Sequence, residues 1–290
     1  MKRLSVISGK GGTGKTMITA ALATILPGPR VMADCDVDAS NLELLLNPRV
    51  ISTRPFYGMP CAEIEAETCV SCGECMDACR FGAISPAEEA CRVNPIRCEG
   101  CAVCTTVCPV EAITMKERIA GEIFYSETEW GPLSHARLEP GAGNSGLLVA
   151  EVKKQAIMKA EDRALLLIDG PPGIGCPLIS TVSGTDAALI VTEPSVSALH
   201  DLERVMRVCQ QFGVKTSVVI NKYTLDEEIT ARIQASCTEW GIDIAALIPF
   251  DERVIKSIRN RQPCTLQESP AASAIRDLGA VIAEKLAFKE

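Results

Sequence analysis

The chain has 290 residues, with 37 acidic side chains against 29 basic ones and a formal net charge of −8. This acidic balance argues against bulk nucleic-acid binding, which depends on lysine and arginine at the phosphates. Fifteen cysteines without a signal-peptide pattern, and no apolar stretch of about 20 residues, argue against a disulfide-rich secreted protein and a membrane span, so we expect a cytoplasmic protein without a stable membrane anchor.

The first motif follows a short apolar strand at residues 4–8. The run GKGGTGKT at residues 9–16 fits the pattern G-x4-G-K-S/T, and an apolar helical pattern follows to Leu26. This strand–loop–helix context predicts a P-loop, in which backbone N–H groups surround phosphates. Lys15 should contact the outer phosphates, and the Thr16 hydroxyl should bind Mg²⁺. The predicted site for ATP and Mg²⁺ comprises Gly9, Gly11, Gly12, Thr13, Gly14, Lys15, Thr16 and Met17.

Acidic side chains follow two further apolar segments. Asp34 and Asp36 come after residues 31–33, and Asp169 follows the strand-like run 164–168. The carboxyl ends of parallel strands meet at one edge of an α/β sheet, which is where such sheets bind ligands. We therefore expect these carboxylates to lie near the P-loop.

Two cysteine runs of identical spacing occupy the middle of the chain. Each reads C-x2-C-x2-C-x3-C, the spacing that holds a 4Fe–4S cluster in bacterial two-cluster ferredoxins. The fourth cysteine of each run ligates the other cluster in such proteins. Structural zinc and disulfides are the alternatives, but zinc sites usually pair two C-x2-C knuckles across a longer loop. We assign one cluster to Cys69, Cys72, Cys75 and Cys108, and the other to Cys98, Cys101, Cys104 and Cys79.

The cysteine runs belong to an internal duplication. Phe81–Ile84 after the first run resembles Val110–Ile113 after the second, with a period of 29 residues, the interval from Cys69 to Cys98. Residues 51–60 are expected to be a linker, and Gly121–Gly146 shows little periodicity. Helices are expected at 147–160, 198–212 and 270–287, and strands at 164–168, 187–192, 216–221 and 244–248. This alternation predicts an α/β fold with a parallel sheet and helices on both faces.

Three features favour structural interpretations. Arg253, Lys256, Arg259 and Arg261 are spaced like one side of a helix, which is more often a solvated face than a nucleic-acid site. The closing helix is expected to dock on the sheet rather than on a membrane, because its polar face carries few basic residues. His135 and His200 are expected to have structural roles.

Lys10 is not required by an ordinary P-loop. The segment KGGTGKT resembles the deviant phosphate loop of the MinD/ParA/nitrogenase-iron-protein superfamily, and nearly the whole chain resembles MinD-superfamily P-loop ATPases with an inserted ferredoxin domain. The resemblance implies a P-loop NTPase domain at residues 1–58 and 119–290, and a bacterial ferredoxin-like α+β domain inserted at residues 59–118.

The resemblance also implies roles for individual residues. Lys10 would reach the partner's phosphates across an ATP-dependent dimer, formed by two copies or with a related ATPase. Asp36 would position the attacking water, so that Lys10, Lys15 and Asp36 form the catalytic set. The remaining nucleotide contacts implied are Asp34 and Asp169 near Mg²⁺, the Gly173 N–H at the γ-phosphate, Asn221 at the adenine edge, and Pro249 and Phe250 on the base.

The expected function is an ATP-driven dimeric switch, with ATP hydrolysis coupled to electron transfer through two 4Fe–4S clusters to a redox or cluster-accepting protein. The alternatives are an iron–sulfur cluster carrier resembling Mrp-type assembly ATPases, and a partner-regulating ATPase of the MinD/ParA kind. Cys176 matches the offset of a cluster-ligating cysteine in the nitrogenase iron protein, but the favoured interpretation is a small buried cysteine.

Overall fold

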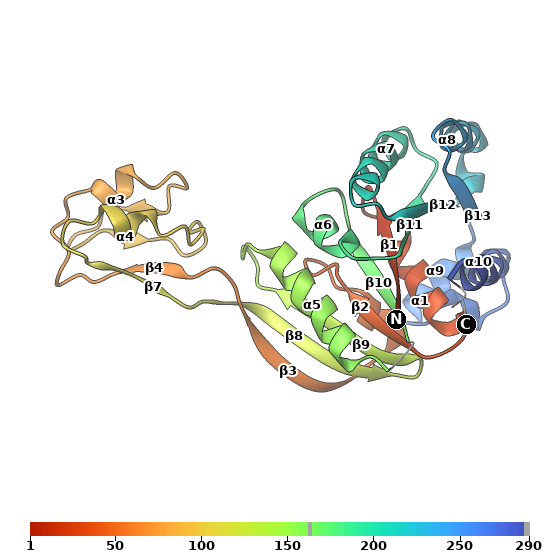
Figure 1. The fold of residues 1–290 in the computed structure, drawn as a ribbon, viewed down its shortest axis with the longest axis horizontal. Coiled ribbons are helices and arrows are strands. Elements are labelled where there is room, and N and C mark those ends of the chain that lie inside the picture. Colours follow the sequence, from red (N-terminus) through yellow and green to blue (C-terminus); the bar gives the residue numbers. More distant parts are fainter. Residues whose placement is uncertain (162–163, 287–290) are drawn as a thin grey trace. The chain divides into compact units, whose positions relative to one another are not determined.

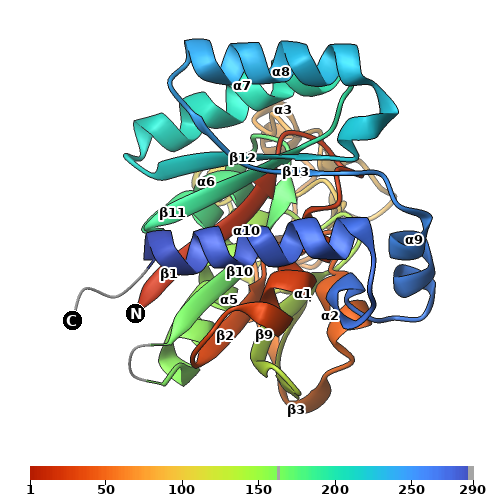
Figure 2. The same cartoon turned by 90° about the vertical axis from the view of Figure 1, so that its right-hand side faces the viewer.

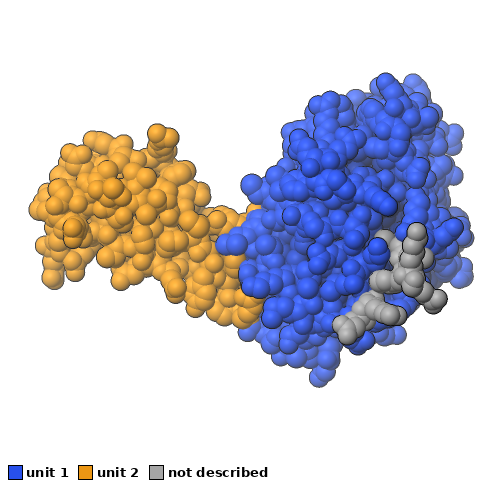
Figure 3. All heavy atoms as spheres, viewed as in Figure 1, with its two compact units in different colours: residues 1–53, 123–137, 146–290 blue, residues 54–122, 138–145 orange. Residues whose placement is uncertain are grey.

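The computed structural model describes residues 1–161 and 164–286. The chain divides into two compact units (Figure 3). Unit 1 comprises residues 1–53, 123–137 and 146 onward, and unit 2 comprises residues 54–122 and 138–145. Unit 2 is therefore inserted into the sequence of unit 1.

Unit 1 is built on a sheet with the strand order β13-β12-β11-β1-β10-β2-β9-β8-β3 (Figure 1). Neighbouring strands from β13 to β9 pair in parallel. The predicted α/β fold with a mostly parallel sheet is therefore confirmed. The strands are β1 (Lys2–Ser8), β2 (Arg30–Asp34), β3 (Arg49–Tyr57), β8 (Ile119–Thr128), β9 (Gly131–Leu138), β10 (Leu165–Pro172), β11 (Ala187–Thr192), β12 (Lys215–Asn221) and β13 (Asp243–Ile248).

Helices cover both faces of this sheet, because its central strands are apolar on both sides (Figure 2). α1, α2 and α10 contribute Leu22, Leu46 and Leu278 to one core. α6, α7 and α8 contribute to a second core across the sheet. The helices of unit 1 are α1 (Lys15–Ile25), α2 (Leu42–Leu46), α5 (Ser145–Lys159), α6 (Cys176–Val182), α7 (Val196–Gln211), α8 (Glu227–Glu239), α9 (Glu252–Arg259) and α10 (Pro270–Leu286), with 3-10 turns η1 (Tyr223–Leu225) and η2 (Cys264–Leu266).

The helix α10 confirms the expected docking on the sheet. Ile275, Leu278 and Ile282 are buried in the same core as α1, and Gly279 lies so close to Ile25 that an added Cβ would meet its Cδ1 at 2.7 Å. Residue 287, at the end of the predicted range, lies outside the described residues. Within the described part of the chain, no helix is both long enough and apolar enough to span a bilayer.

Two expectations about irregular segments are wrong. The linker expected at residues 51–60 is mostly strand β3, and the aperiodic stretch 121–146 contains most of β8 and all of β9. All side chains of β3 except Phe56 are exposed. A strand that is solvated on both faces has no alternation of apolar and polar residues, so its sequence does not indicate a strand.

Unit 2 repeats one structure twice. Its helices are α3 (Glu74–Asp77) and α4 (Val103–Val107), and its strands are β4 (Cys61–Ile64), β5 (Ile84–Ser85), β6 (Arg92–Val93) and β7 (Ile113–Lys116). β4 pairs with β7 and β5 with β6, both antiparallel, with Ile64 opposite Ile113 and Val93 opposite Ile84. A shift of 29 residues converts Ile64 to Val93 and Ile84 to Ile113. The duplication seen in the sequence is therefore also a duplication of strand pairing.

Candidate functional site

The P-loop lies between β1 and α1 and has the backbone that phosphate binding requires. Gly12 and Gly14 have φ angles of 82° and 93°, a left-handed conformation that favours glycine. A Cβ added at Gly14 would meet Asn221 Nδ2 at 2.4 Å. The Thr13 hydroxyl is buried and has no hydrogen-bond partner among the described residues. An unpaired buried donor at this position fits a phosphate ligand.

Lys15 and Asp36 form a buried ion pair in this site. The Lys15 Nζ lies 2.7 Å from Asp36 Oδ2, and the two side chains are 9% and 10% exposed. Burial acts to lower the pKa of Lys15, but the carboxylates of Asp169 and Asp36 outweigh it and raise the pKa. Lys15 is therefore charged, and its ammonium is held by Asp36.

Asp169 and Asp34 occupy different environments at the ends of β10 and β2. Asp169 is fully buried; its Oδ1 accepts a hydrogen bond from Thr19 Oγ1 at 3.1 Å, and its Oδ2 has no partner among the described residues. An unpaired carboxylate oxygen beside a P-loop fits the Mg²⁺ that accompanies a nucleotide. Burial is the first cause that raises the pKa of Asp169.

Asp34 instead supports the helix α2. Its Oδ2 accepts hydrogen bonds from Ser40 Oγ at 2.7 Å and from the Leu42 N–H at 3.0 Å, and its Oδ1 accepts from the Asp36 N–H at 3.1 Å. Burial, and then the nearby Asp169 carboxylate, raise the pKa of Asp34 to about 7. The expected role beside Mg²⁺ stays a prediction, since both oxygens already have partners.

Lys10 is bound within its own chain. Its Nζ lies 2.8 Å from Glu193 Oε1 and donates to Ser195 Oγ at 2.8 Å. Glu193 Oε2 also pairs with Lys222 Nζ at 2.9 Å, and Lys222 donates to the Gly12 carbonyl at 2.9 Å. Burial opposes ionisation of Glu193, but the hydrogen bonds from Lys10 and Lys222 outweigh it and lower the pKa.

Of the residues predicted to hold the base, Asn221 contacts the P-loop. Asn221 Nδ2 donates to the Thr13 carbonyl at 2.8 Å, and its Oδ1 accepts from the Lys222 N–H at 3.0 Å. Phe250 is 40% exposed. A cavity of about 740 Å³ lies beside the P-loop, lined by Gly11, Gly12, Gly14, Lys15, Thr16, Met17, Asp36, Asp38, Ala39, Asn41, Leu44, Leu45, Pro171, Pro172, Gly175, Pro177, Ile258, Arg259 and Arg261.

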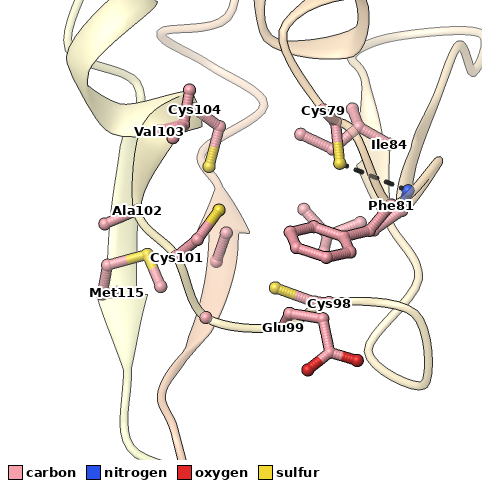
Figure 4. Close-up of a pocket in the computed structure, with 14 residues that line it drawn as sticks. Cys79, Phe81, Ile84, Cys98, Glu99, Cys101, Ala102, Val103, Cys104 and Met115 are labelled. Atoms are coloured by element: carbon pink, nitrogen blue, oxygen red, sulfur yellow. Dashed lines mark hydrogen bonds between the residues drawn. The ribbon is translucent and has the colours of Figure 1, made fainter.

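The eight cysteines of the two spaced runs line two small pockets, each of which takes three cysteines from one run and the fourth cysteine of the other. Cys98, Cys101, Cys104 and Cys79 line one pocket (Figure 4). Cys69, Cys72, Cys75 and Cys108 line the other, together with Cys91. In each run the first and fourth cysteines are half-buried, the second is exposed and the third is buried.

The backbone around the two pockets is repeated as well. Left-handed residues occur in pairs 29 positions apart, at Ser71 and Gly100, at Gly73 and Ala102, and at Gly82 and Glu111. The Ala83 N–H donates to Cys79 Sγ at 3.4 Å, and the Ala112 N–H donates to Cys108 Sγ at 3.3 Å. Such N–H···S hydrogen bonds are typical of thiolates that ligate iron–sulfur clusters.

Within the described ranges, no three histidine, cysteine or acidic side chains converge closely enough to hold one metal ion. A mononuclear zinc site in unit 2 therefore has no support. A four-iron cube binds one thiolate at each corner and spreads its ligands over a larger volume than a single ion does. The two clusters expected from the cysteine spacing therefore stay a prediction at these pockets.

Several residues outside the predicted set contribute to these sites. Glu193 follows β11 at the edge of the sheet where the P-loop lies. Its position directly after a strand is the feature of the sequence that could have indicated a role in the site. Cys91 lines a cysteine pocket although it belongs to neither spaced run. Arg259 and Arg261 line the cavity beside the P-loop, where the sequence indicated only a solvated face.

The expectation of a buried Cys176 is wrong. Cys176 is exposed because it begins α6, whose buried residues are Leu178, Thr181 and Val182. His135 has the expected structural role: it is buried, its Nε2 lies 3.0 Å from Ser126 Oγ and its Nδ1 lies 3.3 Å from Glu43 Oε2.

Residues 4–264 match the family model described as the CobQ/CobB/MinD/ParA nucleotide binding domain. The chain belongs to this family. This CobQ/CobB/MinD/ParA protein is 34% identical to an uncharacterized protein of Methanocaldococcus jannaschii, over 95% of this chain and 94% of the relative. It is 22% identical to the septum site-determining protein MinD of Bacillus subtilis, over 92% of this chain and 83% of MinD.

The fold of this family member also resembles that of a solved MinD. The septum site-determining protein MinD of Pyrococcus horikoshii, complexed with Mg-ADP, superimposes with a TM-score of 0.61 at 21% identity, covering 100% of this chain and 98% of that chain. The MinD/ParA-type P-loop fold predicted from the sequence is therefore confirmed, and the protein is a MinD/ParA-like nucleotide-binding protein.

Proposed function

We propose that this chain is an ATP-driven switch that hydrolyses ATP at the P-loop. The observation that carries this proposal is the buried ion pair between Lys15 and Asp36, 2.7 Å long. The pair keeps the Lys15 ammonium charged and inside the P-loop. A phosphate can bind there by replacing the carboxylate as the partner of the ammonium. Replacement releases Asp36 to accept a hydrogen bond from the attacking water.

Mg²⁺ would be held by the Thr16 hydroxyl and the unpaired Asp169 Oδ2, and when bound it neutralises charge on the phosphates. Thr13, Gly12 and Gly14 present their donors to the phosphates from the P-loop. Asp36 can then position water in line with the terminal phosphate, which is the role implied by the family resemblance. The hydrolysis step is thus assigned to Lys15 and Asp36.

The switch would operate through a dimer. In the nucleotide-free chain Lys10 is paired with Glu193, so it must leave this carboxylate before it can contact the phosphates of a partner. The side chains of Lys10 and Glu193 are 26% and 20% exposed, and ion pairs with such exposure contribute only about 0.2–1 kcal/mol. Phosphate contacts can therefore compete with this pair.

We further propose that unit 2 binds two 4Fe–4S clusters and passes electrons to a protein partner. The support is the pair of four-cysteine pockets with repeated backbone and N–H···S hydrogen bonds. The comparisons favour the partner-regulating ATPase over electron transfer, because the names of the relatives concern nucleotide binding and septum-site determination. The proposal of two clusters is supported only by the cysteines of this chain.

One preparation tests both proposals. We would purify the protein without oxygen, count iron and sulfide, and measure ATP hydrolysis and cluster reduction with and without Mg-ATP. About eight irons per chain support two clusters. Hydrolysis that disappears in Lys15→Ala supports the ATPase, and a reduction rate that changes with ATP supports coupling. Full clusters that do not respond to ATP would favour the partner-regulating ATPase, and absence of iron would refute the clusters.

A further inference from the structure

The C-terminal end of α9 places two arginines in the cavity beside the P-loop. Arg259 is the last residue of α9, and Arg261 follows Asn260, the residue that caps the helix. Both line the cavity that contains Lys15 and Asp36. The P-loop belongs to the β1–α1 connection, whereas the arginines belong to the end of α9 and the residues that follow it (Figure 2). The two groups therefore come from separate segments of the chain.

Neither guanidinium has a partner within the described part of the chain. Arg253, on the same helix, pairs with Asp251 at 3.0 Å, and Arg276 pairs with Glu268 at 2.9 Å. Arg259 and Arg261 are exposed, and their side chains form no hydrogen bond or ion pair with a described residue. Two unpaired cations that face a cavity can bind an anion without first losing a protein partner.

The backbone at Arg261 adopts a left-handed conformation, which costs energy for any residue other than glycine. The Arg261 N–H donates to the Ile258 carbonyl and the Gln262 N–H donates to the Ser257 carbonyl, both at 3.0 Å, and Arg261 has φ 55°. This is a Schellman motif, in which the left-handed residue is usually glycine. Arginine at this position retains the strain of a left-handed L-residue, which is more common at functional sites than elsewhere.

The rest of the lining favours an anionic ligand. Leu44, Leu45 and Ile258 give the cavity apolar walls, which strengthen charge interactions inside it. The lining also contains two carboxylates, of which Asp36 is already paired with Lys15, so Asp38 is set against the two arginines. An anion in the cavity would therefore meet the P-loop N–H groups, Lys15 and the two guanidinium groups.

We propose that Arg259 and Arg261 form a phosphate-binding subsite of the nucleotide site. The ligand is the polyphosphate of a nucleotide, either the one bound in the same protomer or the one bound by the partner in an ATP-dependent dimer. The proposal rests on the proposed nucleotide binding at the P-loop. It assigns a function to residues that the sequence pattern placed on a solvated helix face.

The test compares Arg261→Gly and the double variant Arg259→Gln/Arg261→Gly with Lys256→Gln. Lys256 lies on the same helix, is exposed and does not line the cavity, so its replacement removes one charge from α9 outside the subsite. Glycine relieves the left-handed strain, so the thermal midpoint of Arg261→Gly should not be lower than that of the wild type. A loss of binding in this variant would then not reflect unfolding.

The readouts are the affinity for Mg-ADP and Mg-ATP at low protein concentration, and the ATP-dependent dimerisation measured by light scattering. If the subsite binds the nucleotide of its own protomer, the double variant should weaken nucleotide binding about tenfold or more. If it binds the partner's nucleotide, the affinity of the monomer stays unchanged and dimerisation is lost. Variants that match Lys256→Gln in both measurements would overturn the subsite alone. A wild-type protein without Lys15-dependent nucleotide binding would overturn the proposed function and the subsite with it.

Discussion

Lys15 and Asp36 are bonded to each other at 2.7 Å where nucleotide phosphate is expected to bind. The P-loop lysine is thus paired with an acid of the next loop. Binding of ATP requires an exchange of partners, so the pair couples occupancy of the site to the position of the segment after β2. Because Lys15 and Asp36 would gain different partners in this exchange, substitutions at the two residues should affect different steps.

Replacement of Asp36 by asparagine should separate binding from hydrolysis. Asp36→Asn removes the charge and basicity of the carboxylate that would position water, and loss of such a group typically costs 10²- to 10⁴-fold in rate. Nucleotide affinity should stay equal or increase, because Lys15 no longer has a charged competitor. Single-turnover hydrolysis and equilibrium binding of Mg-ATP measure the two effects. Asp243→Asn, at an exposed carboxylate that pairs with Lys285 and does not line the cavity, is the control, and weaker binding in Asp36→Asn would contradict the exchange.

Release of Lys10 should promote dimerisation. Glu193→Gln removes the carboxylate that holds both Lys10 and Lys222. An exposed pair of this kind contributes about 0.2–1 kcal/mol, so the protein concentration for ATP-dependent dimerisation should fall by up to about fivefold. Light scattering with Mg-ATP provides the measurement, and Glu203→Gln, which breaks the exposed pair with Arg207, is the control. Dimerisation that becomes weaker in Glu193→Gln would show that Glu193 supports the active state.

The cross-ligation of the two proposed clusters can be tested with paired substitutions. If Cys79 and Cys98 ligate the same cluster, the double variant Cys79→Ser/Cys98→Ser should lose that cluster and keep the other, leaving about four irons per chain. Cys79→Ser/Cys72→Ser should impair both clusters, because the two cysteines line different pockets. Iron content and the EPR spectrum of the reduced protein distinguish the cases. The opposite pattern would mean that each run holds its own cluster.

The stability of the nucleotide-free protein should fall as pH rises towards neutrality. The pKa of Asp34 is raised to about 7, first by burial and then by Asp169, whereas an unfolded aspartate titrates near about 3.9. Between these values the folded state keeps a proton that the unfolded state has released, so raising the pH lowers the free energy of unfolding. Above pH 7 Asp34 is ionised in both states, so the free energy of unfolding no longer changes through this group.

The comparison variant for this pH effect is Asp34→Asn. Its side chain can still accept hydrogen bonds from Ser40 and the Leu42 N–H but cannot ionise. Denaturant unfolding of both proteins between pH 5 and 8 should show the wild type losing stability relative to the variant up to about pH 7. Parallel profiles would mean that Asp34 is ionised throughout this range.

The sequence identified the features that follow simple periodic rules. The P-loop, the parallel strands, the docking of α10 and the 29-residue duplication were all predictable from spacing and apolar pattern. β3 was missed because its exposed side chains do not alternate. The pairing of Lys10 with Glu193, and the place of Arg261 in the P-loop cavity, depend on how distant segments meet. No local pattern around either residue encodes those contacts.

The two strands that carry unit 2 have a consequence for how the protein can be modified. β3 leads into the insert and β8 leads out of it, and the two are hydrogen-bonded neighbours in the sheet. The Gly58 N–H donates to the Arg118 carbonyl at 3.1 Å, so the entry and exit of the insert lie one hydrogen bond apart. Residues 58–118, which form most of unit 2, are therefore in effect the loop between two paired strands, and loop length costs little free energy. A short turn that joins Gly58 to Arg118 should yield the nucleotide-binding fold as a free-standing protein, and the excised segment should be transferable into another hairpin.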